Sequence, residues 1–217
     1  MLTYLLAIPL LLIGLVTGPA STDWSKPVAK VQASTVRLSF ESLNMRTGEM
    51  GEAVCTAFSI KSNKGAFYHN FLTAAHCSDE NMLIDKKPAL SIYVNTSLDL
   101  MVVQVAAENF YHPPLKPSTR QLVRGLEVGA LGYGFGFTEP LFRAGHISHP
   151  GYNGIESPWG KDQIIFIFDG PYIGGMSGGP VFDQDGRVVS IIQMSNSLSG
   201  LGRPISVIYS ATAQYWN

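Results

Sequence analysis

The sequence predicts an all-β protein of two packed six-stranded antiparallel β-barrels, followed by a short C-terminal helix. Only 14% of the 217 residues are charged, and 22 glycines and 13 prolines indicate many turns. Short β-prone runs flank a proline-rich stretch at residues 112–119, which cannot form a central strand. We therefore expect a first barrel over about residues 24–111, a linker over 112–119 and a second barrel over 120–217.

The expected strands are short runs separated by glycine, proline or asparagine. Residues 36–40 alternate apolar and polar side chains, the pattern of a strand with one buried face. Asp183-Gln184-Asp185-Gly186 is typical of a hairpin turn. The predicted strands are 29–40, 51–59, 67–73, 90–94 and 101–107 in the first half, and 121–131, 141–149, 163–168, 179–182, 187–193 and 205–209 in the second, with a short helix over 210–217.

The first 20 residues carry no charged side chain and are apolar, with small residues at Gly18 and Ala20. This pattern predicts a secretory signal peptide that is cleaved after Ala20. An uncleaved membrane anchor is the main alternative, although Pro9 and Gly14 interrupt the apolar run, and a buried structural element is a third. Both leading alternatives place residues 21–217 outside the cytosol, as a secreted, periplasmic or membrane-anchored domain.

The charge pattern and the two cysteines limit the partners. A net charge of −1 argues against nucleic acid as a partner. No C-x-x-C or His-x-x-x-His pattern occurs, so we expect no metal site. Cys55 and Cys77 are a single pair that an oxidising compartment favours as a disulfide, and two buried free thiols are the alternative.

Ser177 lies in the glycine-rich segment G-G-M-S-G-G-P and is a candidate nucleophile. A serine on such a turn presents its hydroxyl beside backbone N–H groups that can bind an oxyanion. Taken alone, the segment is equally consistent with a solvated turn. His76 ends an apolar run and Asp99 begins a strand-like run, so the chain also offers a base and an acid to orient it.

Three segments, T-A-A-H-C, D-L-M-V-V-Q-V and G-M-S-G-G-P, resemble the signature segments of trypsin/chymotrypsin-like serine proteases. In the second half, G-Y-G-F-G followed by G-H-I-S resembles Deg/HtrA-type proteases and glutamyl endopeptidases, although no PDZ-like stretch follows. The resemblance implies the double barrel, a Cys55–Cys77 disulfide and a His76, Asp99 and Ser177 triad. It also implies an oxyanion hole formed by the N–H groups of Gly175 and Ser177.

Two details of the resemblance remain open in the sequence. Asp79 and Asp85 are alternatives to Asp99, because only 23 residues separate His76 from Asp99. Pro171 stands where trypsin has its specificity aspartate, so we expect a pocket for a neutral, apolar or small side chain. The predicted walls of this substrate pocket are Pro171, Tyr172 and Ile173 on one side and Ile192, Gln193, Met194 and Ser195 on the other.

The leading functional hypothesis is a serine endopeptidase that hydrolyses protein or peptide substrates through an acyl-enzyme, without a metal or an organic cofactor. The alternative is a catalytically inactive, protease-like binding module. An esterase of the α/β-hydrolase type is disfavoured, because its serine precedes its acid and its histidine in the chain. Met176 stands where trypsin has the aspartate that receives the new N-terminus, so a trypsin-like zymogen switch is not expected. The oligomeric state is not predicted.

Overall fold

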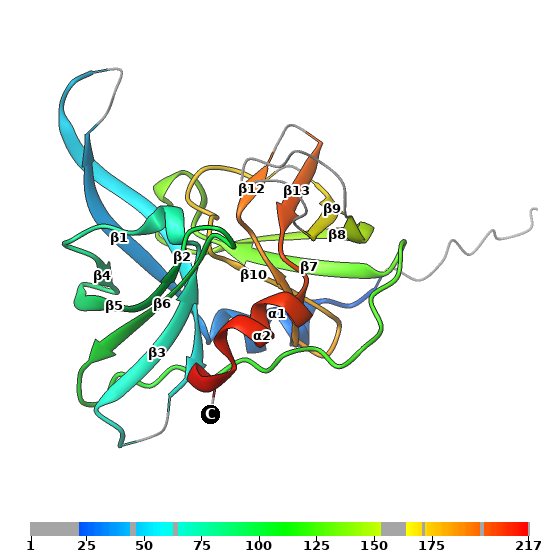
Figure 1. The fold of residues 1–217 in the computed structure, drawn as a ribbon, viewed down its shortest axis with the longest axis horizontal. Coiled ribbons are helices and arrows are strands. Elements are labelled where there is room, and N and C mark those ends of the chain that lie inside the picture. Colours follow the sequence, from blue (N-terminus) through cyan, green and yellow to red (C-terminus); the bar gives the residue numbers. More distant parts are fainter. Residues whose placement is uncertain are drawn as a thin grey trace, which may run out of the picture.

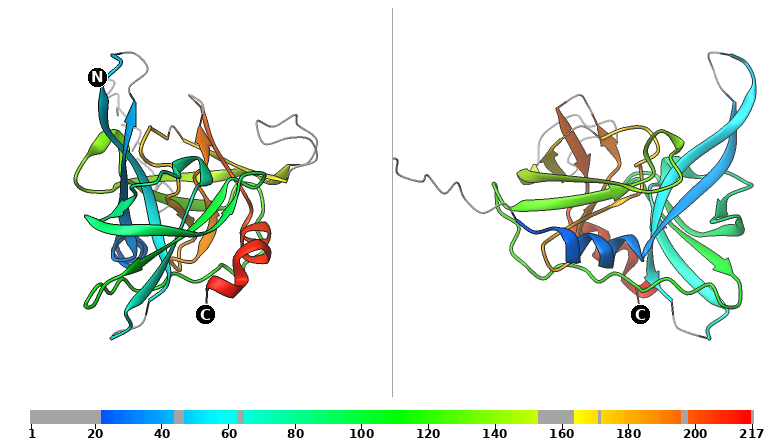
Figure 2. Two further views of the ribbon diagram at one scale, coloured as in Figure 1. Left: turned by 60° about the vertical axis from the view of Figure 1, so that its left-hand side comes forward. Right: turned by 180° about the vertical axis from the view of Figure 1, so that it is seen from behind.

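The structure is a computed structural model that describes residues 22–43, 47–62, 65–152, 164–170, 172–195 and 198–216 (Figure 1). The predicted signal peptide or anchor, residues 1–20, lies outside the described residues. Within the described ranges, no helix combines the length and the apolar character that crossing a bilayer requires. Strands dominate the fold, as the composition predicts, and they form two units that lie side by side (Figures 1 and 2).

The first unit is a closed antiparallel barrel in the order β1-β2-β3-β6-β5-β4. Its interior holds apolar side chains from alternate strand positions, such as Leu38, Phe71 and Val103, none of which is exposed. The closed barrel confirms the predicted first six-stranded unit. Its strands are β1 (Thr35–Leu43), β2 (Met50–Lys61), β3 (Tyr68–Thr73), β4 (Leu83–Ile84), β5 (Lys87–Asn95) and β6 (Leu100–Ala106).

The second unit is a curled, seven-stranded antiparallel sheet in the order β11-β10-β7-β8-β9-β13-β12. Its two end strands, β11 and β12, are separated along the chain only by Ile192 and Gln193, so the sheet bends round into a half-barrel. The strands are β7 (Glu127–Gly132), β8 (Leu141–Tyr152), β9 (Ile165–Asp169), β10 (Pro180–Phe182), β11 (Val188–Ile191), β12 (Met194–Ser195) and β13 (Ser199–Gly202).

Two predicted strands are wrong in part or entirely, because helices occupy their residues. The helix α1 (Ser25–Gln32) includes the first residues of the predicted strand 29–40, and it buries Pro27 and Val31, four residues apart. The helix α2 (Ile205–Thr212) replaces the predicted strand 205–209, and it buries Ile205, Ile208 and Thr212 at helical spacing. The described residues also form three short 3₁₀ helices: η1 (Ala75–Cys77), η2 (Gly134–Gly136) and η3 (Ala213–Tyr215).

A shared core holds the two units together. Val31 of α1, Phe58 of β2, Val188 of β11 and Ile208 of α2 belong to one buried apolar cluster. Figure 2 shows α1 and α2 lying toward the same end of both units. Because the helices and both sheets pack against one core, the loops between the units have a defined relative position.

Candidate active site

His76 and Asp99 leave the barrel at the same edge. His76 follows β3 on the 3₁₀ turn η1, and Asp99 directly precedes β6. These two strands pair antiparallel, with Thr73 opposite Met101. His76 lies three residues after Thr73 and Asp99 lies two residues before Met101, so both lie beyond the same edge of the sheet. The strand register therefore brings a histidine and an aspartate together although 23 residues separate them.

The pair has the geometry of a base held by a buried acid. Nδ1 of His76 lies 2.9 Å from Oδ2 of Asp99, and the backbone N–H of His76 donates to Oδ1 at 2.8 Å. The Asp99 side chain is 5% exposed, whereas that of His76 is 45% exposed. When Nδ1 carries the proton toward the carboxylate, Nε2 is the nitrogen left with a lone pair to accept a proton.

Side chains of the second unit donate hydrogen bonds to the loop that carries Asp99. Gln193 donates through Nε2 to the carbonyls of Leu98 and Asp99, at 2.7 and 2.6 Å. Arg203, which is fully buried, donates to the carbonyls of Ser97, Leu98 and Ile164, at 3.0 to 3.3 Å. Burial lowers the pKa of Arg203, and the nearby charge of Asp99 partly offsets that effect.

These contacts hold Asp99 in a conformation that most residues avoid. Its φ angle is 53°, in the left-handed region, where an L residue other than glycine is disfavoured. Sequence reasoning missed Arg203. The available signal was an arginine between Gly202 and Pro204 in an otherwise apolar stretch. Such an arginine is expected to be buried, and a buried charge needs several hydrogen-bond partners.

Ser177 lies on a loop in which four successive carbonyls accept hydrogen bonds. Thr56 of β2 provides two of the donors, so the first barrel holds a loop of the second unit. The carbonyl of Gly175 accepts from the Thr56 hydroxyl at 2.8 Å, and that of Ser177 accepts from the Thr56 N–H at 2.7 Å. The carbonyl of residue 174 accepts from the Phe135 N–H at 2.8 Å, and that of residue 176 accepts from the Gly179 N–H at 2.9 Å.

The N–H groups of the same loop include two free donors. Among the described residues, none accepts a hydrogen bond from the N–H of Gly175 or of Ser177. A trans peptide directs its N–H opposite to its carbonyl, so both donors point away from the groups that bind the carbonyls. Two adjacent free N–H groups beside a serine are what an oxyanion hole requires.

Glycine is required at position 178 by both φ and space. Its φ is 83°, and an added Cβ would lie 2.1 Å from the carbonyl oxygen of Thr56 and 2.2 Å from the hydroxyl of Thr73. No side chain fits in that gap. The glycines of this segment therefore allow the Ser177 loop to lie directly against β2 and β3.

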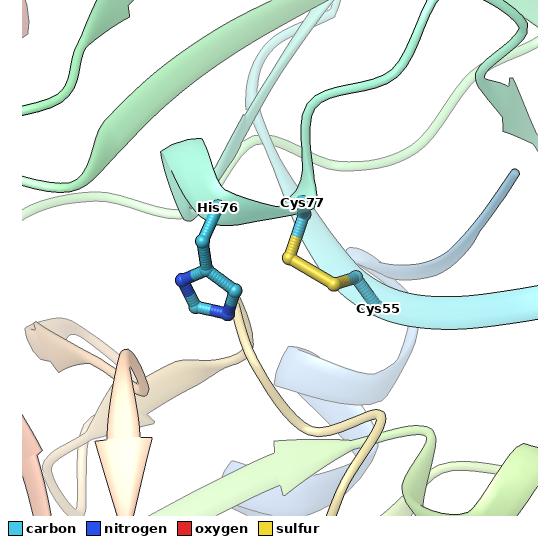
Figure 3. Close-up of side chains that lie close together, drawn as sticks. All are labelled: Cys55, His76 and Cys77. Atoms are coloured by element: carbon cyan, nitrogen blue, oxygen red, sulfur yellow. A yellow bond between two sulfur atoms is a disulfide. The ribbon is translucent and has the colours of Figure 1, made fainter. Parts of the chain in front are cut away.

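The predicted disulfide between Cys55 and Cys77 is confirmed. It ties β2 to η1, and Figure 3 shows Cys77 and His76 projecting from the same turn. The Sγ of Cys77 lies 4.0 Å from the carbonyl oxygen of Ser177, so the serine loop lies beside the histidine turn. The ring nitrogen of His76 and both sulfurs lie within 4.8 Å of one another, but bridged sulfurs are not thiolate metal ligands.

The residues predicted to line the substrate pocket differ in their surroundings. Tyr172 is 5% exposed, and its ring packs at 4.6 Å between centroids against Phe168, so burial raises its pKa strongly. The hydroxyl of Ser195 donates to the carbonyl of Tyr172 at 2.7 Å, which joins the two predicted walls. Ile173 and Met194 are half-buried, Ile192 is in the core of the second unit, and Pro171 lies outside the described residues.

An open space lies beside the paired histidine and aspartate. It is a cavity of about 490 Å³, and Gln193 and Met194 line it together with His76 and Asp99. A larger cavity of about 900 Å³ lies between the linker and α2 and contains none of the predicted site residues. We assign the site to the smaller cavity, because His76 and Asp99 line it.

Comparisons with known proteins agree with this geometry. The trypsin-like peptidase domain family matches residues 55–191, more than half of the chain. No match was found among the curated proteins. The active form of the Mycobacterium tuberculosis protease Rv3671c is similar in structure, with a TM-score of 0.65, 22% identity and coverage of 87% of this chain and 83% of that chain.

Two further solved structures have the same fold. The HtrA-type protease AlgW, solved with a tripeptide, has a TM-score of 0.71 and 16% identity over 90% of this chain and 64% of that chain. Deg5 has a TM-score of 0.67 and 18% identity over 88% of this chain and 92% of that chain. At these identities the likeness shows the fold, and the family match covers the histidine, aspartate and serine segments. The chain belongs to the trypsin-like peptidase domain family.

Proposed function

We propose that this chain is a serine endopeptidase that cleaves protein or peptide substrates with His76, Asp99 and Ser177. The observation that carries the proposal is the 2.9 Å contact between His76 Nδ1 and Asp99 Oδ2, next to a serine loop with two free N–H groups. The family match supports peptidase chemistry, and the polarised His76 supports the serine mechanism.

In the proposed reaction, Nε2 of His76 takes the proton of the Ser177 hydroxyl as its oxygen attacks the scissile carbonyl carbon. The N–H groups of Gly175 and Ser177 bind the oxyanion that forms. His76 then donates the proton to the leaving amine, and the C–N bond breaks to give an acyl-enzyme. Water, deprotonated by His76, attacks the ester carbonyl carbon. The ester C–O bond then breaks, His76 returns the proton to the Ser177 oxygen, and the acid is released. Asp99 stays ionised throughout and stabilises the imidazolium.

A fluorophosphonate probe tests the proposal, because it forms a covalent bond only with an activated serine. We expect the full chain to be labelled, and we expect Ser177→Ala and His76→Ala to lose labelling while remaining folded by circular dichroism. Mass spectrometry of the labelled peptide should identify Ser177. Folded wild-type protein that resists the probe and cleaves no substrate in a denatured proteome would instead support the inactive binding module.

We also propose that the domain works outside the cytosol. The Cys55–Cys77 disulfide supports this, because such bonds persist in oxidising compartments. The apolar first 20 residues support it as well. N-terminal sequencing of the protein from its native host distinguishes the two routes: a mature chain that begins after Ala20 indicates secretion, and an intact N-terminus indicates an anchor.

A further inference from the structure

Thr56 is a residue of the first barrel that forms two hydrogen bonds with the serine loop. It lies in β2 directly after Cys55 of the disulfide, and it is fully buried. We propose that Thr56 is a positioning residue that holds the oxyanion hole in its working shape. The inference rests on the proposed serine endopeptidase function and concerns a residue outside the three that perform the chemistry.

Every polar group of Thr56 has a partner. The hydroxyl donates to the carbonyl of Gly175 at 2.8 Å and accepts from the N–H of Tyr133 at 2.8 Å. The backbone N–H donates to the carbonyl of Ser177 at 2.7 Å, and the carbonyl accepts from the hydroxyl of Thr73 at 2.8 Å. A single buried side chain therefore joins β2, the loop after β7 and the serine loop.

The hydroxyl acts on the peptide that lies between the two oxyanion donors. The N–H of Gly175 belongs to the peptide 174–175, and the N–H of Ser177 belongs to the peptide 176–177. Phe135 N–H and Gly179 N–H hold the carbonyls of these two peptides. The peptide 175–176 connects them, and Thr56 holds its carbonyl while Ile173 accepts from its N–H at 3.1 Å.

Without that hydroxyl, the described residues leave the middle peptide one hydrogen bond, from its N–H to the carbonyl of Ile173 at 3.1 Å. Gly175 has a φ of 98°, and glycine can rotate through conformations that other residues cannot reach. Met176, the next residue, is fully buried and apolar, so its side chain offers no hydrogen bond to the loop. Gly175 carries both the carbonyl that Thr56 holds and one of the two oxyanion N–H groups, so a displacement of Gly175 moves that donor away from the substrate carbonyl.

The hydroxyl is absent from Thr56→Val, which has almost the same shape, and present in Thr56→Ser. We expect Thr56→Val to lower kcat per active site by about 10- to 100-fold. This decrease is no larger than the one expected when a direct oxyanion donor is removed. KM should change less than about twofold, because Thr56 is fully buried and does not contact the substrate. Thr56→Ser should retain kcat within about threefold of the wild type, since it keeps the donor.

The chain contains a matched control in α2. The buried hydroxyl of Thr212 also donates to a carbonyl, that of Ile208 at 2.7 Å, and accepts an N–H, that of Trp216 at 2.9 Å. Thr212→Val removes the same kind of double contact outside the site. We expect both valine variants to unfold at lower urea concentration than the wild type, and only Thr56→Val to lose kcat per active site.

The rate should be measured per active site, titrated by the amplitude of fluorophosphonate labelling, so that unfolded molecules do not count. Unlabelled wild-type protein would refute the proposed function. A labelled wild type with Thr56→Val at wild-type kcat would overturn the role of Thr56 and leave the proposed function intact. If Thr56→Val does not fold, Thr56→Ala provides the same comparison. If neither folds while Thr212→Val does, Thr56 is only structural and the inference is overturned.

Discussion

Asp99 binds His76 twice, through Oδ2 to the ring Nδ1 at 2.9 Å and through Oδ1 to the backbone N–H at 2.8 Å. One carboxylate therefore fixes both the side chain and the turn that carries it. The two contacts are possible because β3 and β6 are neighbours in the barrel. When Nδ1 of His76 carries the proton, both oxygens of Asp99 accept hydrogen bonds from the same residue.

Asp99→Asn should reduce kcat by about 10⁴-fold, because an amide in place of the carboxylate favours the wrong tautomer of the histidine. Asp85→Asn is the control. Asp85 is one of the two alternative acids in the sequence, and it is exposed on the turn between β4 and β5. Hydrolysis of a peptide substrate measures both variants. Equal loss in the two, or none in Asp99→Asn, would contradict the assignment of Asp99.

Arg203→Met should lower the free energy of unfolding by about 3 kcal/mol, since it leaves buried carbonyls of Ser97, Leu98 and Ile164 without their charged donor. Arg120→Met is the control, because Arg120 forms an exposed ion pair with Asp185 at 2.8 Å. Such pairs contribute about 1 kcal/mol or less. Urea unfolding followed by tryptophan fluorescence compares the two, and similar losses would show that the Asp99 loop does not depend on Arg203.

Gly178→Ala should destabilise the protein by more than about 3 kcal/mol and abolish activity, because the new Cβ overlaps the Thr56 carbonyl and the Thr73 hydroxyl. Gly48→Ala separates the steric effect from the backbone effect. Gly48 also has a positive φ, 72°, but nothing lies within 4 Å of an added Cβ. We expect Gly48→Ala to lower the free energy of unfolding by only about 1 kcal/mol. Thermal unfolding tests both, and an active Gly178→Ala would mean that the serine loop does not lie against β2.

Loss of the disulfide should lower the free energy of unfolding by about 3 kcal/mol, the value expected when a crosslink closes a loop of this length. The double variant Cys55→Ala, Cys77→Ala tests this, and reduced wild-type protein should behave in the same way. Guanidinium unfolding with and without reductant measures the difference. Reductant should leave the double variant unchanged, and a shift there would reveal an effect unrelated to the bridge.

Stability should decline at alkaline pH because of two tyrosines. Burial raises the pKa of Tyr133 to about 12 and raises that of Tyr172 further. A raised pKa means that the folded state keeps a proton which the unfolded chain loses near pH 10, so the stabilisation is complete below about pH 10 and is lost above it. Tyr172→Phe should flatten the fall in Tm between pH 9 and 11.5. An equally steep fall in that variant would assign the effect to other groups.

The segments around His76 and Ser177 were recognisable in the sequence, because the chemistry needs these residue types within a few positions of one another. The acid was harder to assign. Asp79, Asp85 and Asp99 all follow His76, and the pairing of β3 with β6, which selects Asp99, is a long-range contact. No local pattern specifies that register.

The helices α1 and α2 show a second limit of prediction from the sequence. Their residues include Val28, Val31, Ile205 and Ile208, which favour strands when they are judged by type alone. Packing of one face of each helix on the shared core decided otherwise. Helical spacing of the apolar residues was present in the sequence, but each helix is only eight residues long. The spacing of apolar residues in such short runs does not distinguish a helix from a strand.

The sequence by itself determined the β-rich composition, the two halves, the disulfide pair and two of the three candidate catalytic residues, because these depend on residue type and local spacing. Only the tertiary structure decided which groups support them. Thr56, Gln193 and Arg203 act through hydrogen bonds to backbone carbonyls of distant segments. Every residue carries such a carbonyl, so the partners of these side chains have no signature along the chain, and only the folded arrangement identifies them.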